Sequence, residues 1–431
     1  MAREQVRSIQ GTEDVLPAGW GHWRRLYEAA RTVFESFGYG EVRTPVIEDV
    51  QLFVKGTGET TDIVQKEMYT IPTGEDEAIA LRPEGTPPVV RAYLEHSLHK
   101  QQPFRKLYYA GPMFRRERPQ RGRLRQFHQL GVEVFGSTSP LVDAETVLMA
   151  GEVFRRVGLT RHTVWINTIG CPQCRPAFRA RLLEILRGRT EELCADCRDR
   201  IERNVMRVYD CKNEGCRRVV DSLPEMTDHL CEACTAHHAE VRAALTRAGA
   251  GFRDDPRLVR GLDYYTRTVY EIKHPDLGAR DAICGGGRYD GLVEELGGPP
   301  TPGVGFSIGA EATLLAMEAE LGPAPDSSAS PTAYVVCFDD ALRCDAFALV
   351  HDLRRAGVSA DMDYEGRSPK SQLRVANRLN VRLCCLLGPD EAARGEVTLK
   401  DMTEGRQWAA PRAEAAQQAA ALPTPDASKE G

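Results

Sequence analysis

The sequence predicts a mixed domain of helices and strands, interrupted by a helical, cysteine-rich insertion and followed by a smaller α/β domain. Three observations support this organisation. The chain has 431 residues, which is enough for two or three domains of ordinary size. Eight of its thirteen cysteines lie between Cys171 and Cys234. The segment GPAPDSSASPT, at residues 322–332, has the proline-, serine- and alanine-rich composition of a linker.

The first part of the chain alternates between helical and strand-like patterns. Apolar side chains recur at helical spacing over residues 18–37, and a second helix is expected at about 140–157. Short strands, the first of them interrupted by Pro45, are expected between these helices at 38–49, 77–86 and 105–117. These elements form the first part of the larger domain, over residues 1–170.

The insertion is expected over residues 171–250, where the sequence is mostly helical and charged. Strand-like, glycine-rich sequence returns at 259–272 and 282–297, so the larger domain is expected to resume at residue 251 and to end at 321.

Beyond the linker, strand and helix patterns alternate over residues 333–412 and predict a compact α/β unit. Ser368 and Pro369 are expected to begin one of its helices, as the N-cap and the first-turn residue. Residues 413–431 have too little apolar bulk to fold alone, so a disordered tail is expected there.

Composition limits the class of protein. The chain is 42% hydrophobic and 27% charged with a net charge of −6, so any binding of nucleic acid would depend on local basic patches. The start, MAREQVRSIQ, lacks the apolar segment of a signal peptide, and no later stretch approaches a membrane span. A cytoplasmic protein without a membrane partner is therefore expected, and its cysteines are not expected to form disulfides.

Four cysteine pairs lie in the insertion, as CPQC, CADC, CKNEGC and CEAC. Such pairs are a strong signal for tetrahedral zinc–thiolate sites. Eight thiolates would make two structural zinc sites, with the ligands Cys171, Cys174, Cys194, Cys197, Cys211, Cys216, Cys231 and Cys234. The spacing leaves the pairing open, and His237 or His238 could replace a cysteine. The alternative is a set of reduced cysteines without metal. The other five cysteines are expected in the core: Cys284, Cys337, Cys344, Cys384 and Cys385.

The stretch FRRERPQRGRLRQFHQLGVEVFG, at residues 114–136, carries six arginines between Arg115 and Arg125 and then becomes strand-like. One face of that strand would carry Gln129, Gly131 and Glu133, as in the wall of a small polar pocket. If the loop is a hairpin, Arg115 reaches this pocket and the other loop arginines lie over its mouth. Guanidinium groups suit phosphates and nucleic acids. A solvated edge hairpin with surface charge is the alternative.

Three further motifs supply polar groups for the same pocket. RPEGT offers Glu84 and Thr86, RGLDYYTR offers Arg260 with two tyrosines, and GGGRYDG offers glycines that permit close backbone approach. Carboxylates, a glutamine, a tyrosine hydroxyl and an arginine could hold a cationic or amphoteric small ligand. Arginines above a glycine floor could hold a triphosphate.

Taken together, the motifs GTEDVLP, LRPEGT, the arginine-rich stretch, RGLDYYTRTVYE and GGGRYDGL resemble those of histidyl-tRNA synthetases, which are class II aminoacyl-tRNA synthetases. The resemblance runs from about residue 8 to 410, and RGLDYYTR is highly specific to the family. It implies an α+β class II catalytic core on an antiparallel sheet, with the mostly helical insertion and a C-terminal α/β anticodon-binding domain. It also implies a homodimer formed through residues 39–48.

The resemblance further implies ATP-dependent activation of L-histidine and its transfer to the 3′ end of tRNA(His). By motif position, Glu84, Thr86 and Gln129 would hold the α-amino group of histidine, and Glu133 with Tyr265 would bind the imidazole. A carboxylate and a phenol on opposite sides of the ring satisfy both ring nitrogens. The full histidine site implied by the resemblance is Glu84, Thr86, Gln129, Glu133, Arg260, Tyr264 and Tyr265.

Arg115 and Arg260 would be the catalytic residues, placed at the α-phosphate where charge develops during attack on ATP. The ATP, with its Mg²⁺, would contact Arg115, Arg123 and Tyr289. The acceptor end of the tRNA would meet the loop residues Gln120, Arg121, Arg123 and Arg125. A zinc-bound insertion near the acceptor arm would be structural.

One position departs from the class II pattern. In GVGFSIGAEATLLAME, Ala312 stands where the family motif has an arginine that contacts the γ-phosphate, and alanine cannot make that contact. A neighbouring arginine such as Arg123 substitutes, or ATP binds weakly, or adenylation is lost. We favour substitution or tolerance, because the other ligand positions are occupied appropriately.

Two other functions compete with the synthetase. One is a non-charging histidine-binding paralogue, such as the regulatory subunit of ATP phosphoribosyltransferase. Such chains typically lack the intact RGLDYYTR pattern and the anticodon domain, both of which are present here. The other is a non-catalytic sensing module, for which the sequence contains no effector domain.

Overall fold

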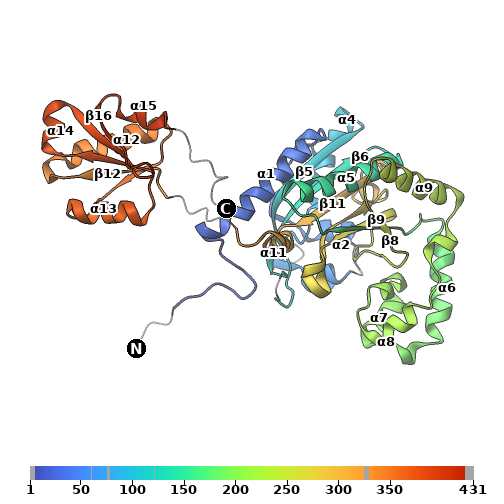
Figure 1. Ribbon diagram of the computed structural model, residues 1–431. Helices are drawn as coiled ribbons and strands as arrows, with labels where there is room; N and C mark the ends of the chain where they lie inside the picture. The colour runs from blue at the N-terminus through green and yellow to red at the C-terminus, as the bar shows by residue number, and fades with distance from the viewer. Residues whose placement is uncertain (1–4, 60, 75–77, 121, 325–329, 423–431) are drawn as a thin grey trace. The chain divides into compact units, whose positions relative to one another are not determined.

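The computed structural model describes residues 5–59, 61–74, 78–120, 122–324 and 330–422 (Figure 1). The chain divides into two compact units between residues 327 and 328. No helix among the described residues is both long and apolar enough to span a membrane.

The larger unit is built on an eight-stranded sheet. Its interior neighbours are antiparallel, and only the edge pairs β1–β5 and β7–β8 are parallel. The predicted antiparallel class II core is confirmed. In spatial order the strands are β1 (Gly40–Glu41), β5 (Arg105–Phe114), β6 (Gln126–Phe135), β11 (Gly303–Gly309), β10 (Ala282–Arg288), β9 (Thr266–Lys273), β7 (Thr163–Thr168) and β8 (Arg253–Asp254).

Three helices pack on one face of this sheet: α1 (Trp20–Ser36), α5 (Pro140–Arg156) and α11 (Ala310–Leu321). A short 3₁₀ helix, η1 (Pro17–Gly19), precedes α1. The helical spacing predicted α1 and α5 with their ends correct to within two residues. The Ser139 side chain accepts the Leu141 backbone N–H and so caps α5, whose first residue is a proline.

The arginine-rich stretch forms a hairpin, because β5 and β6 are paired antiparallel from Arg105 opposite Phe135 to Phe114 opposite Gln126. Leu130, Val132 and Val134 face the core under the helices, where each is at most 1% exposed. Strand alternation therefore places Gln129, Gly131 and Glu133 on the opposite face, as the sequence predicted.

A second, three-stranded antiparallel sheet lies in the same unit, in the order β2 (Ile47–Asp49), β4 (Ala78–Leu81) and β3 (Tyr69–Pro72). Short helices connect and follow these strands: α2 (Val50–Thr57), the π-helix η2 (Ile63–Glu67), α3 (Thr86–Glu95) and α4 (Leu98–Gln101). The turn between β4 and α3 carries the RPEGT motif.

The insertion between β7 and β8 is helical, and its α6, α7 and α8 lie apart from the sheet (Figure 1). The last helix, α9, returns along α5. The elements are α6 (Arg175–Arg187), η3 (Thr190–Glu192), α7 (Ala195–Arg203), η4 (Val205–Asp210), α8 (Glu214–Val220), η5 (Met226–His229) and α9 (Glu232–Arg247).

The strand expected over 259–272 begins only at Thr266, so the prediction is wrong for its first seven residues. Side chains hold this stretch in place of a strand ladder. Arg207 donates to the Gly261 carbonyl at 3.1 Å, and Arg175 donates to the Tyr265 carbonyl at 3.1 Å. After β9 follow η6 (Pro275–Arg280) and, beyond β10, α10 (Leu292–Glu295).

The smaller unit has a five-stranded sheet in the order β13-β12-β14-β15-β16, with three parallel and two antiparallel strands. Pro369 opens α13 as predicted, but the Ser368 side chain at the N-cap makes no capping hydrogen bond. In chain order the elements are β12 (Ala333–Cys337), η7 (Asp340–Leu342), α12 (Arg343–Arg355), β13 (Ala360–Met362), α13 (Pro369–Arg378), β14 (Leu383–Leu387), α14 (Pro389–Arg394), β15 (Glu396–Asp401), β16 (Gln407–Pro411) and α15 (Ala415–Ala420).

The disorder expected from residue 413 onwards is wrong for the first part of that segment. Helix α15 buries Ala415, Ala416 and Ala419 against the core of the smaller unit. Small side chains suffice there because the helix packs on an existing core. The rest of the expected tail, residues 423–431, lies outside the described residues.

Candidate active site and metal centres

Glu84 forms the first half of a buried pair of carboxylates on the face of the large sheet opposite α1, α5 and α11. It lies in the turn after β4 and is 3% exposed. Its carboxylate accepts the hydroxyl of Thr57 at 2.5 Å and the hydroxyl of Tyr264 at 2.9 Å. Burial raises the pKa of Glu84, and these two hydrogen bonds and the charge of Arg115 oppose the shift.

Glu133 forms the second half. It projects from β6, is 1% exposed, and accepts the Thr86 hydroxyl at 2.6 Å and the Tyr289 hydroxyl. Burial raises the pKa of Glu133 to about 8, although both hydroxyl donors favour the ionised form. Strongly shifted carboxyl pKa values cluster at functional sites, so Glu133 is a candidate ligand-binding group.

Glycines make room for this polar pocket. A Cβ atom at Gly131 or at Gly85 would overlap the ring of Tyr109, which lies between them. A Cβ atom at Gly305 would overlap the Glu133 carboxylate itself. The glycine floor predicted from the sequence therefore has a steric cause.

Gln129 offers an unused acceptor on the same face. Its buried Oε1 atom has no hydrogen-bond partner among the described residues. A buried polar atom without a partner is costly, so this atom is available to a ligand.

Arg115 and Arg260 bring positive charge to the carboxylates. Arg115 donates to the Pro83 carbonyl at 3.0 Å and stacks over the Phe127 ring at 5.2 Å. Burial lowers the pKa of Arg115, while the negative charge of Glu84 opposes the shift and the positive charge of Arg260 adds to it. Because the charges of Glu84 and Arg260 both act on Arg115, these three side chains lie near one another in the site.

Arg260 is anchored by an ion pair with Glu271 on β9. Its guanidinium occupies the space above Gly285, where any Cβ atom would collide with it. Burial opposes its charge, but Glu271 raises the pKa of Arg260 above the ordinary value. The Nε atom has no partner among the described residues, which leaves a donor for an anion.

The three tyrosines predicted for the site lie together. The rings of Tyr264 and Tyr265 are 4.7 Å apart, and the rings of Tyr264 and Tyr289 are 5.7 Å apart. Burial raises the pKa of Tyr265 to about 12, so this phenol is neutral and can donate at neutral pH. Tyr289, which the resemblance assigns to ATP, donates its hydroxyl to Glu133 in the carboxylate cluster.

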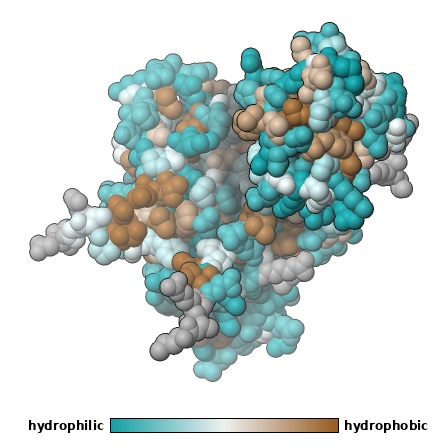
Figure 2. Space-filling model, turned by 90° about the vertical axis from the view of Figure 1, so that its left-hand side faces the viewer, coloured by the Kyte–Doolittle hydropathy of each residue, from teal (hydrophilic) through white to brown (hydrophobic). Residues whose placement is uncertain are grey.

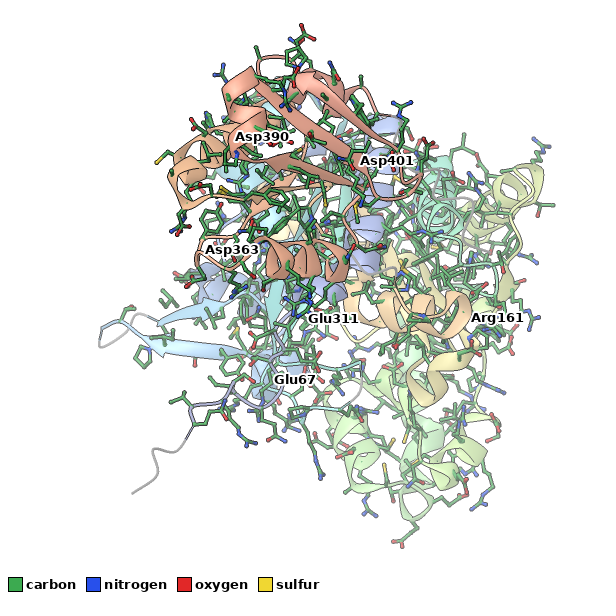
Figure 3. The ribbon with its side chains drawn as sticks, turned by 60° about the vertical axis from the view of Figure 1, so that its left-hand side comes forward. Glu67, Arg161, Glu311, Asp363, Asp390 and Asp401 are labelled. Atoms are coloured by element: carbon green, nitrogen blue, oxygen red, sulfur yellow. The ribbon has the colours of Figure 1, made fainter. Side chains whose placement is uncertain are left out.

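The hairpin loop is held by acidic side chains and by backbone carbonyls. Arg123 pairs with Glu117 and, at 3.2 Å, with Glu67, which Figure 3 labels. Arg125 donates to the backbone of Glu117 and of Gln10. The backbones of Gln120 and Arg123 bridge the turn, and Arg121 lies outside the described residues.

This loop bounds an open, charged cavity of about 590 Å³. Its lining comes from η2 and the loop: Lys66, Glu67, Arg116, Glu117, Arg118, Pro119, Gln120 and Arg123. Arg118 and Arg123 therefore line this cavity, whereas Arg125 serves to anchor the loop.

Ala312, the departure from the class II motif, lies in the first turn of α11 and is half-buried against the main core. The preceding Glu311, labelled in Figure 3, accepts the His128 backbone N–H at 2.9 Å and contacts His128 Nδ1 at 2.9 Å. The acidic residue of the motif thus fixes α11 to β6.

Several site residues were not foreseen from the sequence. Thr57 donates to Glu84, the Tyr109 ring lies against Gly85 and Gly131, and Glu67, Glu117 and Glu271 hold the arginines. Glu117 lies in the arginine-rich stretch and Glu271 in RGLDYYTRTVYE. A glutamate in a motif that also contains arginines could therefore have been predicted to pair with one of them. Thr57 and Tyr109 carried no signal, because only the tertiary fold brings them to the site.

A fully buried ion pair lies behind the site. Arg288, which precedes Tyr289 at the end of β10, pairs bidentately with Asp143 on α5, and both side chains are 0% exposed. His237 from the insertion approaches the same carboxylate, with its Nε2 atom 3.1 Å from Asp143 Oδ1. Strand β10, helix α5 and helix α9 of the insertion therefore meet at the Asp143 carboxylate.

The cysteine pairs form two groups. Cluster A is Cys171, Cys174, Cys231 and Cys234, and cluster B is Cys194, Cys197, Cys211 and Cys216. In each cluster the sulfur atoms lie within 4.8 Å of one another. Cluster A joins the first pair of the insertion to the last, and cluster B joins the two middle pairs. This settles the pairing that the sequence left open.

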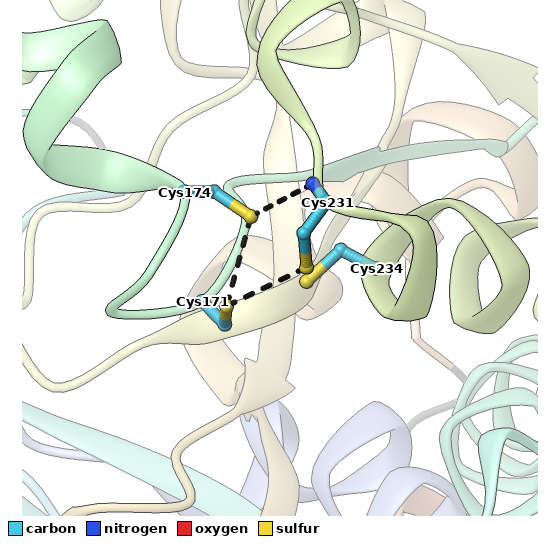
Figure 4. A group of neighbouring side chains, drawn as sticks. All are labelled: Cys171, Cys174, Cys231 and Cys234. Atoms are coloured by element: carbon cyan, nitrogen blue, oxygen red, sulfur yellow. Dashed lines mark hydrogen bonds between the residues drawn. The ribbon is translucent and has the colours of Figure 1, made fainter.

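Sulfur geometry in cluster A suits a tetrahedral metal (Figure 4). Cys171 Sγ lies 3.6 Å from Cys174 Sγ and 3.9 Å from Cys231 Sγ, and the Cys231 N–H donates to Cys174 Sγ at 3.1 Å. Zinc–sulfur bonds of about 2.3 Å place tetrahedral ligands about 3.8 Å apart. Cluster B has the same pattern, with a sulfur separation of 3.8 Å and an N–H donor from Cys194 to Cys216 at 3.1 Å.

Both clusters can hold a metal ion through sulfur alone. Among the described residues neither His237 nor His238 belongs to a cluster, since His237 contacts Asp143 and His238 lies 3.9 Å from Asp254. Of the five cysteines outside the insertion, four are buried as expected. Cys344 is exposed on α12, so that expectation was wrong.

Comparisons with known proteins agree with this geometry. Residues 11–313 match the family described as Histidyl-tRNA synthetase, and residues 332–422 match the Anticodon binding domain. The chain belongs to the histidyl-tRNA synthetase family. The resemblance predicted from the motifs is therefore confirmed.

Relatives in the family cover nearly the whole chain. A histidine–tRNA ligase of Desulforamulus reducens is 48% identical over 398 residues, covering 92% of this chain and 95% of that protein. The crystal structure of apo histidyl-tRNA synthetase from S. aureus is similar with a TM-score of 0.80 and 33% identity, covering 96% of this chain and 100% of that chain.

The fold alone does not separate the synthetases from their paralogues. A Bacillus halodurans structure described as an ATP phosphoribosyltransferase regulatory subunit/histidyl-tRNA synthetase is also similar, with a TM-score of 0.64 at 20% identity over 90% of this chain. The high identity to named ligases favours the synthetases over the regulatory paralogue.

Proposed function

We propose that the chain is a histidine–tRNA ligase, which activates L-histidine with ATP and transfers it to the 3′ end of tRNA(His). The observation that carries the proposal is the pair of buried carboxylates, Glu84 and Glu133, beside the anchored arginines Arg115 and Arg260. One part of this site suits an ammonium and an imidazole, and the other suits a phosphate.

Histidine would bind between the carboxylates. Glu84 and Gln129 offer acceptors for the α-amino group, and Glu133 and Tyr265 would bind the two imidazole nitrogens. Thr86 donates to Glu133, so it positions that carboxylate as well as lining the site. An apolar side chain would leave these buried groups unpaired, which is the basis of the expected selectivity.

Activation would occur where Arg115 and Arg260 approach each other. A carboxylate oxygen of histidine would attack the α-phosphorus, the bond between that phosphorus and the bridging oxygen would break, and pyrophosphate would leave; Mg²⁺, where bound, would supply positive charge to the pyrophosphate. The two guanidiniums stabilise the charge that grows on the α-phosphoryl oxygens. In the second step a ribose hydroxyl of the terminal nucleotide attacks the carbonyl carbon of the adenylate, and AMP leaves.

ATP and the acceptor end would share the cavity beside the hairpin loop. Arg123 would contact the ATP phosphates, and Gln120, Arg121 and Arg125 complete the loop that meets the acceptor end. Tyr289 is better assigned to the histidine side, because its hydroxyl donates to Glu133.

The smaller unit would bind the anticodon. A cavity of about 400 Å³ lies at the carboxyl ends of β12 and β13, bounded by Phe338 and by the loop that leads into α13. The buried Asp363, labelled in Figure 3, accepts the N–H of Arg367 at 2.8 Å and so shapes this loop. The exposed Phe338 ring offers a face on which a base can stack.

Zinc is the metal we propose for clusters A and B. Four sulfur ligands without an open position suit structural Zn²⁺, which would hold the insertion together and take no part in the reaction. Denatured protein is expected to release two zinc ions per chain into a colorimetric chelator. A chain that folds with intact thiols and no bound metal would contradict this assignment.

We also propose a cytoplasmic homodimer. Reduced cysteine clusters require a reducing compartment. On the face drawn in Figure 2, apolar patches interrupt a mainly hydrophilic surface. In the small sheet Ile47 and Ile71 are 51% and 47% exposed, as expected of residues that a second copy would cover. Light scattering should give twice the chain mass, and Ile47→Lys should shift it towards the monomer.

Histidine-dependent ATP–pyrophosphate exchange tests the function directly. Exchange that requires histidine, followed by charging of a tRNA(His) transcript, is the expected result and would show that Ala312 is tolerated. Histidine binding without exchange would instead support a sensing paralogue and overturn the proposal.

A further inference from the structure

The first cysteine pair of the insertion lies beside the tyrosines of the histidine pocket. Strand β9 begins at Thr266, directly after Tyr264 and Tyr265. Residues 169–175, here called the first knuckle, follow β7 and carry Cys171 and Cys174 of cluster A. The roles proposed above for the histidine and ATP residues make no use of this segment.

The backbone of the first knuckle extends the pairing of β7 with β9. The Ile169 N–H donates to the Arg267 carbonyl at 2.8 Å, and the Arg267 N–H donates to the Gly170 carbonyl at 2.8 Å. The Thr266 hydroxyl donates to the same Gly170 carbonyl at 3.1 Å. Both backbone groups of Arg267 are therefore held by the two residues that precede Cys171.

Arg267 has a left-handed backbone conformation, with a φ angle of +53°. A residue with a Cβ atom rarely adopts this conformation unless the surrounding structure enforces it. Arg267 is the second residue of β9, so its conformation sets the direction in which the chain enters the strand from Tyr265. The Tyr265 ring in turn lies against Gly287, where an added Cβ atom would approach it to 2.9 Å.

Arg175 adds a side-chain contact to the tyrosines. It follows Cys174 directly, and its backbone N–H donates to the Cys171 carbonyl at 3.1 Å, so the first knuckle fixes its position. Its half-buried side chain donates from Nη1 to the Tyr265 carbonyl at 3.1 Å. The residue proposed to bind the imidazole is therefore held by the residue next to a cysteine of cluster A.

A glycine and the cysteines keep the first knuckle in place. Gly170 has a φ angle of +65°, and a Cβ atom there would lie 2.3 Å from the Met226 side chain and 2.9 Å from Cys174. Cys171 Sγ lies 3.9 Å from the sulfur of Cys231, the residue that precedes α9. The sulfur atoms of cluster A thus bring the first knuckle and the start of α9 together.

We propose that Arg175 is a positioning residue for histidine binding and that cluster A anchors it. By holding the Tyr265 carbonyl and the Arg267 backbone, the first knuckle fixes the direction of the Tyr265 phenol. The inference rests on the proposed synthetase function and assigns to the base of the insertion a part in recognising the amino acid.

The other contacts of the insertion with this loop lie before the tyrosines. Arg207 donates to the Gly261 carbonyl at 3.1 Å, and Asn204 donates to the Asp263 carboxylate at 2.6 Å. Arg175 instead reaches the backbone of Tyr265 itself. Loss of its side chain should therefore weaken histidine binding and leave ATP binding unchanged.

The test compares three variants of the full-length chain in ATP–pyrophosphate exchange without tRNA. Arg175→Ala removes the donor to Tyr265, Arg175→Lys retains a donor, and Arg181→Ala is a matched control. Arg181 lies on the same helix, but its side chain is exposed and pairs with Glu184. KM for histidine, KM for ATP and kcat are measured, together with zinc content and amide hydrogen exchange.

Arg175→Ala is expected to raise KM for histidine about 10-fold, because a hydrogen bond from a charged donor is lost. KM for ATP and kcat should stay within about 2-fold, since the imidazole is bound alike in the ground state and the transition state. Arg175→Lys should keep KM for histidine within about 3-fold, and Arg181→Ala within about 2-fold.

Hydrogen exchange gives a readout that does not depend on activity. In Arg175→Ala the amides of residues 264–268 should exchange at least about 10-fold faster, while those of β11 stay unchanged and the zinc content is retained. Cys234→Ser should accelerate exchange at residues 264–268 and raise KM for histidine in the same way. Cys344→Ser, which removes an exposed thiol in the smaller unit, should do neither.

Two results would overturn the proposal. Unchanged KM for histidine and unchanged exchange at residues 264–268 in Arg175→Ala would show that the contact positions nothing. An equal rise in KM for histidine and for ATP, with no rescue by Arg175→Lys, would indicate a general loss of structure. A failure of the synthetase function itself would be seen separately, as absent pyrophosphate exchange in the unsubstituted chain.

Discussion

Removing the carboxylate of Asp143 is the sharpest test of how the site is supported. This side chain is fully buried and accepts hydrogen bonds from Nε and Nη2 of Arg288. The Nε2 atom of His237 lies 3.1 Å from its Oδ1 atom. None of these groups touches the histidine pocket, yet Arg288 precedes Tyr289, whose hydroxyl reaches Glu133. The substitution Asp143→Ala therefore perturbs the support of the site without removing a proposed ligand.

The structure sets the magnitude. Removing one partner of a buried ion pair costs about 3–5 kcal/mol, because the other charge stays buried without compensation. In the variant Arg288 can still donate to the Ser137 carbonyl at 2.8 Å and pair with Asp290 at 3.0 Å. We therefore expect the free energy of unfolding to fall by about 3 kcal/mol, the lower end of this range. At about 2–4 °C per kcal/mol, the melting temperature of the larger unit should fall by about 6–12 °C.

The assay is thermal unfolding followed by tryptophan fluorescence, with Glu184→Ala as the control. Glu184 pairs with Arg181 on the exposed face of α6, so its loss should cost less than about 1 kcal/mol. Asp143→Asn keeps the shape and loses the charge, so it separates the electrostatic cost from a cavity effect. Equal melting temperatures for Asp143→Ala and Glu184→Ala would refute the reasoning.

The pH dependence of this contribution has a definite sign. His237 and Arg288 lower the pKa of Asp143 against the effect of burial, so the folded carboxyl ionises below the unfolded one. The pair therefore stabilises the protein fully above about pH 4, and this stability is lost as the pH falls through the folded pKa. In the Asp143→Asn variant this contribution to the pH dependence of stability should be absent.

Three further predictions concern the site and the insertion. Glu133→Gln should lower kcat/KM for histidine in the exchange reaction about 100-fold, since the buried carboxyl group proposed to bind the imidazole is replaced by an amide. Because the folded pKa of Glu133 is raised to about 8, the free energy of unfolding should fall as pH rises from about 4.5 to 8, and urea titrations should show this slope weakened in Glu133→Gln. Arg123→Ala should raise KM for ATP about 10-fold if Arg123 substitutes for the motif arginine, and Ala312→Arg in the same chain should restore it; absence of rescue would count against the substitution. Cys234→Ser should reduce the zinc content from two ions to one and speed proteolysis within the insertion, and an unchanged metal content would contradict the assignment of cluster A.

Periodicity and motif residues account for most of the fold that could be predicted. The alternation along β6 placed Gln129, Gly131 and Glu133 on one face, because the strand period of two does not depend on tertiary context. The cysteine spacing predicted two clusters, but their pairing depended on how α6 to α9 fold back, which no local pattern encodes.

The errors have physical causes of the same kind. The stretch before Thr266 is rich in strand formers, yet side chains of Arg207 and Arg175 donate to its carbonyls, and these tertiary contacts override its propensity. Helix α15 has little apolar bulk, but burying three alanines on an existing core is enough to order it. The hydrogen bond from Tyr289 to Glu133 was not predicted, because hydroxyl contacts depend on side-chain direction.

Cluster A brings the first and last cysteine pairs of the insertion to a single point, although about sixty residues separate them along the chain. A segment whose entry and exit meet in this way can be lengthened, shortened or exchanged without changing the separation of the strands on either side. Closing so long a loop also removes chain entropy from the unfolded state, so one tie stabilises the whole segment. The insertion therefore has the connectivity of an interchangeable module, and it can diversify in sequence while the sheet that carries the chemistry stays fixed.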